Sequence, residues 1–441
     1  MRAYDVIEAK RDGRELTFEE LNFFIKGYCE GKIPDYQAAA LLMAIFLKGM
    51  HEKETAYLTG IMACSGDKID LSEIPGIKVD KHSTGGVGDK ITLIIAPLVA
   101  ACGVPVAKMS GKGLGHTGGT IDKLESIPGF MTMLSQKDFI ANVKNIGIAI
   151  TGQTGNLAPA DKKLYSLRDV TATVNNISLI ASSIMSKKIA SGADKIMLDV
   201  KTGSGAFMKT IESSIELANT MVKIGEEVGR KTTAIVTDMD IPLGFAIGNS
   251  LEVIEAIETL KGKGPKELEE VSIEVAARML ELAEKGDIVH CRKLVLEALK
   301  SGEALRKFSQ LVENQGGNIE IINDYSILGS AKYQQDVVST FEGYVSSIKT
   351  DQVGLASMIL GAGRETKESN IDYTAGIILK IKKGMLVKKG DLLARLYTNS
   401  QGKLEEAEKI LKESIDTSET LVTSRPLILA LVNIDTIERY V

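Results

Sequence analysis

The sequence predicts an α/β fold in three parts: a small all-helical domain, a large mixed α/β domain with a central, mainly parallel sheet, and a C-terminal β-rich α+β subdomain. Helical patterns fill about the first seventy residues. From about residue 76, short apolar strands alternate with helices, which is typical of a parallel sheet with crossover helices. Beyond about residue 335, apolar strands alternate with glycine turns. A chain of 441 residues also exceeds the size at which a single core keeps growing, so several domains are expected.

The first helical segment has a recognisable start. Thr17 stands three residues before Glu20, which is the spacing of a capping box, and Leu16 can pack against Leu21 as a hydrophobic staple. Residues 35–47 are rich in alanine, leucine and methionine, which suits a buried helix. We therefore expect a packed helical unit at the start of the chain.

Two strand–loop–helix units follow. The first consists of the strand IKVD, the loop KHSTGGVGD and the helix TLIIAPLVAACG. The second consists of the strand VPVAKMS, the loop GKGLGHTGGT and the helix IDKLESI. Further strands are expected at 148–153, 195–200 and 232–239, and further helices at 157–174 and 178–191.

The C-terminal part repeats a Lys-Lys-Gly turn between apolar segments, in YTAGIILKIKKGMLVKKGDLLARLYT. Similar strings occur in lipoyl and biotinyl carrier domains, but no lysine lies in the Met-Lys-Met or Asp-Lys-Ala turn of such a carrier. We therefore predict a small β-rich structural module.

Charge and composition argue against nucleic-acid and membrane partners. The 58 acidic and 53 basic residues are scattered and give a net charge of -5, so no basic surface is expected. The longest apolar stretch, 91–107, is short for a membrane span and is interrupted by Pro97, Gly103 and Pro105. The charged first residues lack the apolar core of a secretion signal, which predicts a cytoplasmic protein. The 4 cysteines lack the spacing of a zinc site or a disulfide framework.

Two glycine-rich loops are the strongest functional feature. Each is expected where a parallel strand ends and a helix begins, which is where open α/β sheets bind ligands. Glycine lets an anion approach the backbone, and the first NH groups of a helix favour negative charge. The loops therefore predict a site for inorganic phosphate, with glycine kept for packing alone as the alternative. Charged and hydroxyl side chains flank both loops: Lys81, Ser83, Thr92, Lys108, Ser110 and Thr120.

Nucleotide-binding motifs fit less well. Neither loop matches the pattern of a P-loop, so a Walker ATPase is disfavoured. Gly113, Gly115 and Gly118 form a GxGxxG, but no acid ends a following strand at the distance that a ribose hydroxyl requires. No organic cofactor is therefore expected.

Both loops resemble segments of a known enzyme family. VDKHSTGGVGDK and AKMSGKGLGHTGGTIDKLE are similar to two hallmark segments of the thymidine and pyrimidine-nucleoside phosphorylases. TGNLAPADKKLYSLRDVTATV and SLIASSIMSKKIASGADKIMLDVKTGSGAFMK extend the resemblance, which covers nearly the full chain. It implies a homodimer formed through a helical domain, which also binds the base. The implied boundaries are 1–65 with 163–193 for the helical domain, 76–154 with 197–334 for the α/β phosphate-binding domain, and 335–441 for the C-terminal subdomain.

The resemblance also implies roles for individual residues. The family's phosphate ligands correspond to Lys81, Ser83, Thr92, Ser110 and Thr120, with Lys108 nearby, in agreement with the reasoning from the loops. Its base-recognition residues correspond to Arg168, Ser183 and Lys187, with Tyr165 one helical turn before Arg168. The histidine near the reacting bond corresponds to His82. His82, Arg168 and Lys187 are thus the expected catalytic residues.

The implied reaction is the reversible phosphorolysis of uridine, thymidine or deoxyuridine to the free base and (2-deoxy)ribose 1-phosphate. Phosphate would attack the anomeric carbon directly, with inversion and without a covalent enzyme intermediate. His82 could act as a general acid or only as a hydrogen-bond donor, and both roles stay open. The preferred nucleoside also stays open, since side chains such as Phe207 and Leu114 could shape the pocket.

Bacterial phosphorylases similar to this chain also carry a monovalent cation, potassium, held by carbonyls and a carboxylate. The residue at position 90, which can be threonine, is lysine here. If its carbonyl is the ligand the side chain matters little, but an ammonium nearby could compete with the ion. A second departure is Lys112, where arginine is more common, because lysine keeps the charge and loses the planar fork. The corresponding potassium positions are Gly88, Lys90, Leu243, Ala246 and Glu255.

Two other functions stay open. A phosphoribosyltransferase of the anthranilate type has a similar architecture, but it needs a pyrophosphate and magnesium site with paired acids. A catalytically silent protein that binds nucleoside or phosphate is the second alternative. The Lys-His-Ser triplet of the first loop and the base-recognition set suit a pyrimidine nucleoside better than the substrates of a phosphoribosyltransferase. The intact polar positions argue against a silent binding protein.

Overall fold

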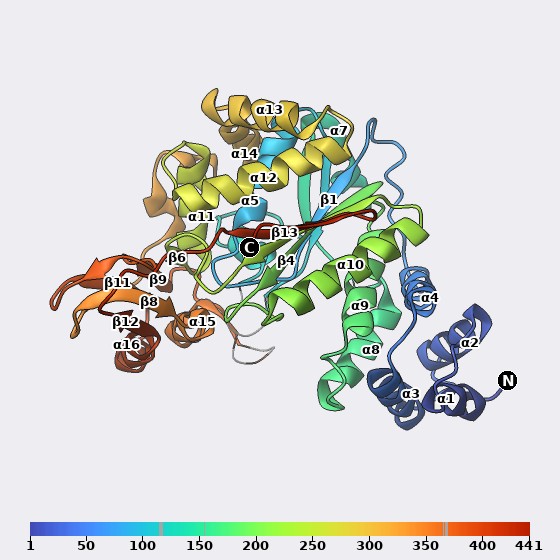
Figure 1. Ribbon diagram of the computed structural model, residues 1–441. Coiled ribbons are helices and arrows are strands. Elements are labelled where there is room, and N and C mark those ends of the chain that lie inside the picture. Colours follow the sequence, from blue (N-terminus) through green and yellow to red (C-terminus); the bar gives the residue numbers. More distant parts are fainter. Residues whose placement is uncertain (114–117, 154, 365, 367–368) are drawn as a thin grey trace.

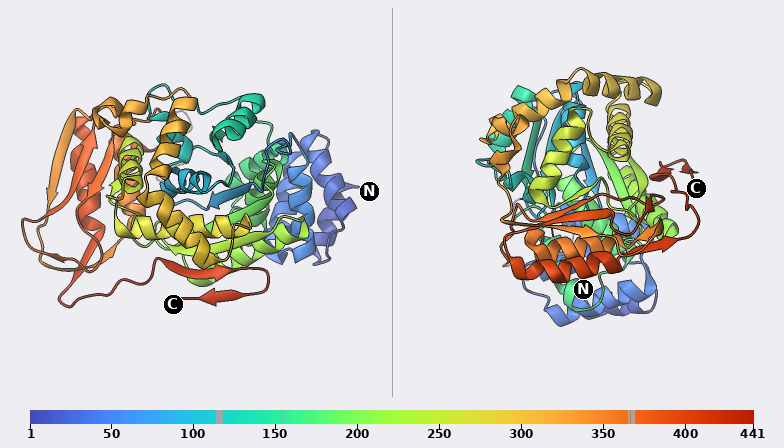
Figure 2. Two further views of the ribbon diagram at one scale, coloured as in Figure 1. Left: turned by 90° about the horizontal axis from the view of Figure 1, so that it is seen from above. Right: turned by 90° about the vertical axis from the view of Figure 1, so that its left-hand side faces the viewer.

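The computed structural model describes residues 1–113, 118–153, 155–364, 366 and 369–441. The chain forms the three predicted parts, so the fold class is confirmed (Figure 1). The helical domain and the C-terminal β-rich unit lie at opposite ends of the α/β domain (Figure 2). Within the described ranges, no helix combines the length and the apolar character needed to cross a membrane.

The helical domain joins the N-terminal helices to two helices from the middle of the chain. Its core packs Phe24 and Leu41 together with Ala160 and Leu179. The Thr17 hydroxyl accepts a hydrogen bond from the Glu20 amide, which confirms the predicted capping box. The helices are α1 (Ala3–Arg11), α2 (Phe18–Cys29), α3 (Asp35–Lys48), α4 (Glu52–Ala63), α8 (Pro159–Val170) and α9 (Ile177–Ala190).

The α/β domain is built on parallel strands, as predicted. Strands β1 (Val79–Ser83), β4 (Lys195–Thr202) and β5 (Thr232–Asp238) pair in parallel in that order. Strands β2 (Val106–Ser110) and β3 (Ile148–Gly152) form a second parallel pair beside β1. The strands are mostly buried because helices cover them. These helices are α5 (Ile91–Ala101), α6 (Thr120–Glu125), α7 (Gln136–Ile146), α10 (Ile211–Glu227), α11 (Asn249–Leu260), α12 (Lys266–Leu282), α13 (Ile288–Lys300) and α14 (Glu303–Asn314).

The last two strands differ from the expected boundary at 335–441. Strand β13 (Ile428–Val432) pairs antiparallel with β5, and β14 (Ile437–Arg439) extends the same sheet. The chain therefore leaves the C-terminal unit after β12 (Ile415–Ser418) and returns to the α/β domain. This pairing covers the edge of β5, which would otherwise expose unpaired backbone groups.

The C-terminal unit contains two small sheets whose strands pair antiparallel. Strand β6 (Ala246–Ile247) comes from the α/β domain and pairs with β9 (Gly376–Leu379), so the two parts share one sheet. Both predicted Lys-Lys-Gly turns form, with positive φ at Gly384 and Gly390. The remaining elements are β7 (Tyr333–Val338), β8 (Gly343–Ile348), β9 (Gly376–Leu379), β10 (Leu386–Val387), β11 (Leu392–Thr398), α15 (Thr350–Ser357) and α16 (Leu404–Glu413).

Candidate functional site

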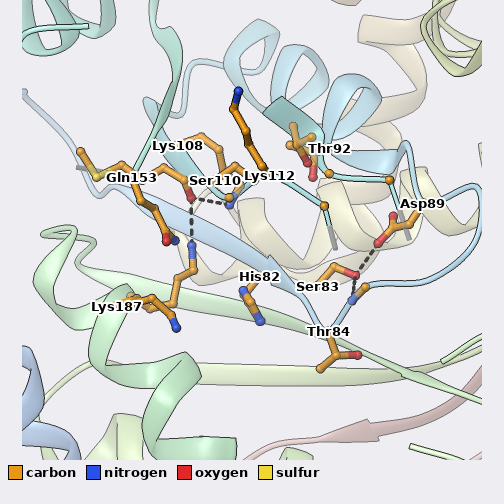
Figure 3. Close-up of a pocket in the computed structure, with 18 residues that line it drawn as sticks. His82, Ser83, Thr84, Asp89, Thr92, Lys108, Ser110, Lys112, Gln153 and Lys187 are labelled. Atoms are coloured by element: carbon orange, nitrogen blue, oxygen red, sulfur yellow. Dashed lines mark hydrogen bonds between the residues drawn. The ribbon is translucent and has the colours of Figure 1, made fainter. Parts of the chain in front are cut away.

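The two glycine-rich loops meet at the ends of adjacent strands. Strand β1 ends at Ser83 and leads to α5, and strand β2 ends at Ser110 and leads to α6. Between the loops lies a cavity of about 340 Å³, shown in Figure 3, a size that suits a small molecule. We call it the anion cavity. Its lining residues are His82, Ser83, Thr84, Gly85, Asp89, Thr92, Lys108, Met109, Ser110, Gly111, Lys112, Gly113, Gly118, Gly119, Thr120, Gln153, Lys187 and Lys188.

Most of the predicted phosphate-binding residues line this cavity, and Lys81 does not. Because side chains alternate along a strand, Lys81 points to the face of β1 opposite to Asp80 and His82. Its ammonium is buried 3.3 Å from the Asp199 carboxylate. The predicted residues on the cavity wall are Ser83, Thr92, Lys108, Ser110 and Thr120.

Predicted positions in the second loop are only partly described. Leu114 and Gly115 lie outside the described residues. Lys112 lines the cavity with a half-exposed side chain and pairs with Glu125 at 2.8 Å. The charge at position 112 is thus present at the cavity, as expected.

The first loop holds its polar groups in place before any ligand binds. The Gly85 amide donates to the Ser83 hydroxyl at 3.2 Å, and Ser83 donates to the Asp89 carboxylate. Burial by itself raises the pKa of Asp89, but Lys81 and Lys201 outweigh it, so the pKa lies below the usual value. Asp89 therefore stays ionised and orients Ser83.

Charged residues on the wall of the anion cavity and in the protein interior behind it form what we call the lysine cluster. Within it, Asp80 lies 2.8 Å from Lys188 and 3.4 Å from Lys108. Burial and the neighbouring ammonium groups Lys188 and Lys81 lower the pKa of Lys108 to about 7, against the opposing effect of Asp80. The cluster thus carries more positive charge than its carboxylates satisfy. It consists of Lys81, Lys108, Lys188 and Lys201 with Asp80, Asp89 and Asp199.

His82 lies in the anion cavity between Lys187 and Ser83 (Figure 3). Burial and then the nearby ammonium groups, of which Lys188 and Lys108 come first, lower the pKa of His82 well below its usual value. The imidazole is therefore neutral near pH 7, with one nitrogen that donates and one that accepts.

Lys187 and Ser183 come from α9 of the helical domain. Lys187 lines the anion cavity, and its ammonium contacts Asp161 at 2.7 Å and the Ser183 hydroxyl at 3.2 Å. Ser183 is buried and does not line the cavity itself. Asp161 was not predicted from the sequence. Asp161 lies on α8, one helical turn before Tyr165 and two turns before Arg168. This spacing does not indicate an ion pair with Lys187 on α9.

Arg168 is placed differently from the other predicted base ligands. It is buried, and its guanidinium donates to the carbonyls of Thr173 (3.2 Å), Val174 (2.7 Å) and Leu179 (3.1 Å). These bonds use three of its five N–H groups. In this structure Arg168 therefore holds the connection between α8 and α9, and its side chain is not on the wall of the anion cavity.

A second, less polar cavity of about 770 Å³ adjoins the first. The two cavities share Thr84 and Gly85. Tyr165, Ile180 and Phe207 give the second one its apolar wall. A polar, lysine-lined cavity and a less polar cavity with aromatic side chains thus lie next to each other, between the helical and α/β domains.

Comparisons with known proteins agree with this geometry. Residues 76–305 match the family model described as "Glycosyl transferase family, a/b domain" and residues 4–66 match its helical bundle domain. Residues 344–418 match "Pyrimidine nucleoside phosphorylase C-terminal domain". The chain is 56% identical to the pyrimidine-nucleoside phosphorylase of Geobacillus stearothermophilus over 97% of this chain and 99% of that protein. It is 57% identical to that of Bacillus subtilis (strain 168) over 93% and 95%.

The chain belongs to the pyrimidine-nucleoside phosphorylase family. Among solved structures, anthranilate phosphoribosyltransferase from Thermus thermophilus aligns with a TM-score of 0.58 at 19% identity. That alignment covers 70% of this chain and 99% of the transferase. At this identity it supports the shared fold only.

The potassium positions implied by the phosphorylase family do not fit a bound ion here. The Lys90 ammonium itself donates to Leu243 O and Ala246 O, both at 2.8 Å, and to the Glu255 carboxylate at 2.5 Å. Gly88 lies against the same carbonyls, since an added Cβ would meet Leu243 O at 2.7 Å. The ammonium thus lies among the oxygens that would hold the ion.

A clamp on the second glycine loop was also not predicted. The Asp122 carboxylate accepts from the amides of Gly113 (2.6 Å) and Gly119 (3.2 Å), which brings the two ends of the loop together. Arg364 from the C-terminal unit donates to Asp122 at 2.7 Å and to Gly113 O at 3.2 Å. The acid three residues after Gly119 is the only local signal for this clamp, because Arg364 lies far away in the sequence.

Proposed function

We propose that this protein splits pyrimidine nucleosides with inorganic phosphate and releases the free base and the (2-deoxy)ribose 1-phosphate. One observation carries the proposal: a cationic, hydroxyl-lined anion cavity opens through Thr84 and Gly85 into a less polar cavity. The names of the relatives, which match along almost their whole length, support the same reaction.

Phosphate is placed in the anion cavity, where charge and hydrogen-bond donors meet. Ser83, Ser110 and Thr120 supply hydroxyl groups, and Thr92 lies in the first turn of α5, whose dipole favours an anion. Lys108 supplies the buried positive charge. Held there, a phosphate oxygen attacks the anomeric carbon of a nucleoside that lies across Thr84 and Gly85, and the centre inverts.

His82 acts on the departing base as a donor of a hydrogen bond or of a proton. Burial and then four nearby ammonium groups lower its pKa. A phosphate dianion beside it raises the pKa again, since an opposite charge favours the imidazolium. Phosphate binding thus increases the fraction of His82 that carries the extra proton when the base leaves.

Lys187 stabilises the negative charge that gathers on the base. Its ammonium is held by Asp161 and the Ser183 hydroxyl, so it is already oriented when the substrate arrives. Ser183 contributes through this contact. Arg168 remains a predicted base ligand, because two of its N–H groups are not used by the carbonyls it holds.

We also propose that the protein forms a homodimer through its helical domain and works in the cytoplasm. Large apolar side chains are exposed there, including Tyr36 (75%) and Leu47 (72%) on α3 and Tyr4 (56%) on α1. Surfaces of this kind mark protein interfaces. Light scattering after size exclusion should give the mass of two chains, and a Leu47→Glu, Tyr36→Glu double variant should give one. A wild-type monomer would contradict the proposal.

The reaction is tested by following ultraviolet absorbance with uridine, thymidine and deoxyuridine, with and without phosphate. We expect release of base only with phosphate, formation of sugar 1-phosphate without free sugar, and no loss on chelation of magnesium. Lys187→Met should release base far more slowly than the wild type, and the matched variant Lys162→Met, an exposed lysine on α8, should behave as the wild type. Nucleoside binding without base release would favour the silent binding protein, and magnesium dependence would favour a phosphoribosyltransferase.

A further inference from the structure

The segment 242–246, which follows β5 and ends at the start of β6, and Glu255 on α11 surround the end of one lysine with oxygen atoms. Lys90 Nζ contacts the carbonyls of Leu243 and Ala246, each at 2.8 Å, and Glu255 Oε2 at 2.5 Å. The Lys90 side chain has no exposed surface, and that of Glu255 is 12% exposed. We call these groups the Lys90 cage. Carbonyl oxygens arranged in this way can replace the hydration shell of a potassium ion.

We propose that the Lys90 ammonium takes the place of a monovalent cation in this protein, so that its structure does not depend on potassium. The lysine end carries one positive charge, as the ion does, and is attached to the chain. The cation is therefore part of the chain itself, and the protein keeps its affinity for ligands and its ordered structure when potassium is replaced by another salt.

The hydrogen bonds of the cage support this assignment. An ammonium has three N–H donors, and Lys90 has three oxygen acceptors within hydrogen-bond distance. The Glu255 carboxylate balances its charge. A potassium ion among the same oxygens would lie against the ammonium, and in a buried place the repulsion between two cations is only weakly screened. Ion binding would thus require that Lys90 leave the cage.

A second lysine binds the same segment from the other side. Lys382 from the C-terminal unit donates to Pro242 O at 2.9 Å and to Gly244 O at 2.7 Å. Two ammonium groups therefore hold carbonyls of the segment in an alternating order. These carbonyls of the segment therefore accept hydrogen bonds from lysine side chains and are not free to coordinate an ion.

The cage connects the cation position to the anion cavity. Lys90 precedes α5 directly and follows Asp89, so its contacts fix the end of the first glycine loop against the segment 242–246. Gly88 has a φ of 75° and passes so close that an added Cβ would lie 2.7 Å from Leu243 O. The backbone bond from Leu243 N to Val87 O, at 3.2 Å, joins the two segments further.

Thermal unfolding of the wild-type protein tests the inference without any variant. Unfolding is measured in potassium chloride and in tetramethylammonium chloride at equal ionic strength. We expect midpoints that agree within about 1 °C, because a ligand that does not bind the native state does not shift the midpoint. A saturable rise of several degrees with potassium would overturn the proposal. The readout does not involve turnover, so it is independent of the proposed reaction.

Two variants sharpen the test. Lys90→Thr removes the ammonium and leaves a small hydroxyl, so its midpoint should fall in tetramethylammonium and rise saturably by several degrees with potassium. Lys382→Met is the matched control, because it removes the other ammonium and keeps Lys90. Its midpoint should fall equally in both salts. A Lys90→Thr protein that ignores potassium would contradict the existence of a cation position in the cage.

Crystals soaked in rubidium chloride give a direct readout if Lys90→Thr does not fold. Rubidium scatters anomalously and replaces potassium in oxygen sites. In the wild type we expect no anomalous peak between Leu243 O, Ala246 O and Glu255. A peak at that position, with the Lys90 side chain displaced, would overturn the proposal.

Discussion

The Lys90 cage and the lysine cluster are two buried groups of charges, and they differ in how far their hydrogen bonds are satisfied. In the cage, three oxygens surround one ammonium. In the cluster, the Lys81 ammonium has no hydrogen-bond partner among the described residues, and Asp80 is shared between Lys108 and Lys188. A fully paired buried charge serves the structure, whereas an under-paired one beside a cavity has capacity left for a ligand.

The largest expected effect separates the cage from the cluster by stability. Lys90→Met removes the ammonium that balances the mostly buried Glu255 carboxylate and that donates to two carbonyls, so it should cost about 3–5 kcal/mol of unfolding free energy. Lys108→Met removes a charge that burial and its neighbours already disfavour, so the unfolding free energy should change by less than about 1 kcal/mol. Calorimetry in buffer without phosphate or sulfate measures both. If the two variants lose equal stability, the distinction between the groups fails.

The next effect concerns the leaving base. Lys187→Met should lower kcat/KM by about 10²–10³-fold, because it removes a positive charge aimed at the developing negative charge. The phosphate KM should change much less, since Lys187 is held by Asp161 on the side of the helical domain. Steady-state kinetics with uridine and varied phosphate measures both parameters. A loss that appears in the phosphate KM alone would place Lys187 with the anion ligands.

The cluster should also link anion binding to pH. The pKa of Lys108 is about 7 in the free protein, and a bound dianion raises it, so binding above pH 7 takes up a proton. The dissociation constant should then rise with pH above about 7, by up to about tenfold per unit. Sulfate is the suitable probe, because it does not titrate in this range, unlike phosphate. Titration calorimetry at pH 6 to 9 measures the slope.

The variant Lys108→Met provides the control for this linkage. It should bind sulfate more weakly and with a flatter dependence on pH. Lys382 does not line the anion cavity and donates to the carbonyls of Pro242 and Gly244, so Lys382→Met should keep the wild-type slope of sulfate binding. An unchanged slope in Lys108→Met would assign the proton to another group, with His82 as the next candidate because its pKa is also lowered.

The sequence predicts the parts of this site that depend on local pattern. The glycine loops, their hydroxyl residues and the strands that carry them follow from the period of apolar residues and from the turn chemistry. The fold class follows in the same way. The family resemblance adds Lys187 and the positions of the cage.

The pairing of buried charges could not be predicted, because it depends on tertiary contacts. Lys90 meets Glu255 across 165 positions, and Lys188 meets Asp80 across 108. Neither pair produces a periodic signal. The contacts of Arg168 could not be predicted either. Its residue type suits a base ligand, but its surroundings in the folded chain supply three carbonyl acceptors. The pairing of β13 with β5 in the central sheet likewise joins segments that are far apart in the sequence.

The smallest expected effect tests whether a paired charge that touches the anion cavity behaves like the cage. Arg364 is paired with Asp122 at 2.7 Å, with side chains 14% and 1% exposed, and it holds the second glycine loop. Arg364→Met should cost about 1–2 kcal/mol of unfolding free energy and raise the phosphate KM by roughly three- to tenfold, because the loop loses one of its supports. Arg395→Met, which breaks an exposed pair with Asp336 in the same unit, should cost less than about 1 kcal/mol and leave the KM unchanged. A lower kcat with an unchanged KM in Arg364→Met would mean that the clamp acts on the reacting groups. Buried charges would then not divide simply into paired ones that stabilise the structure and under-paired ones that bind ligands, because Arg364 would be paired and functional.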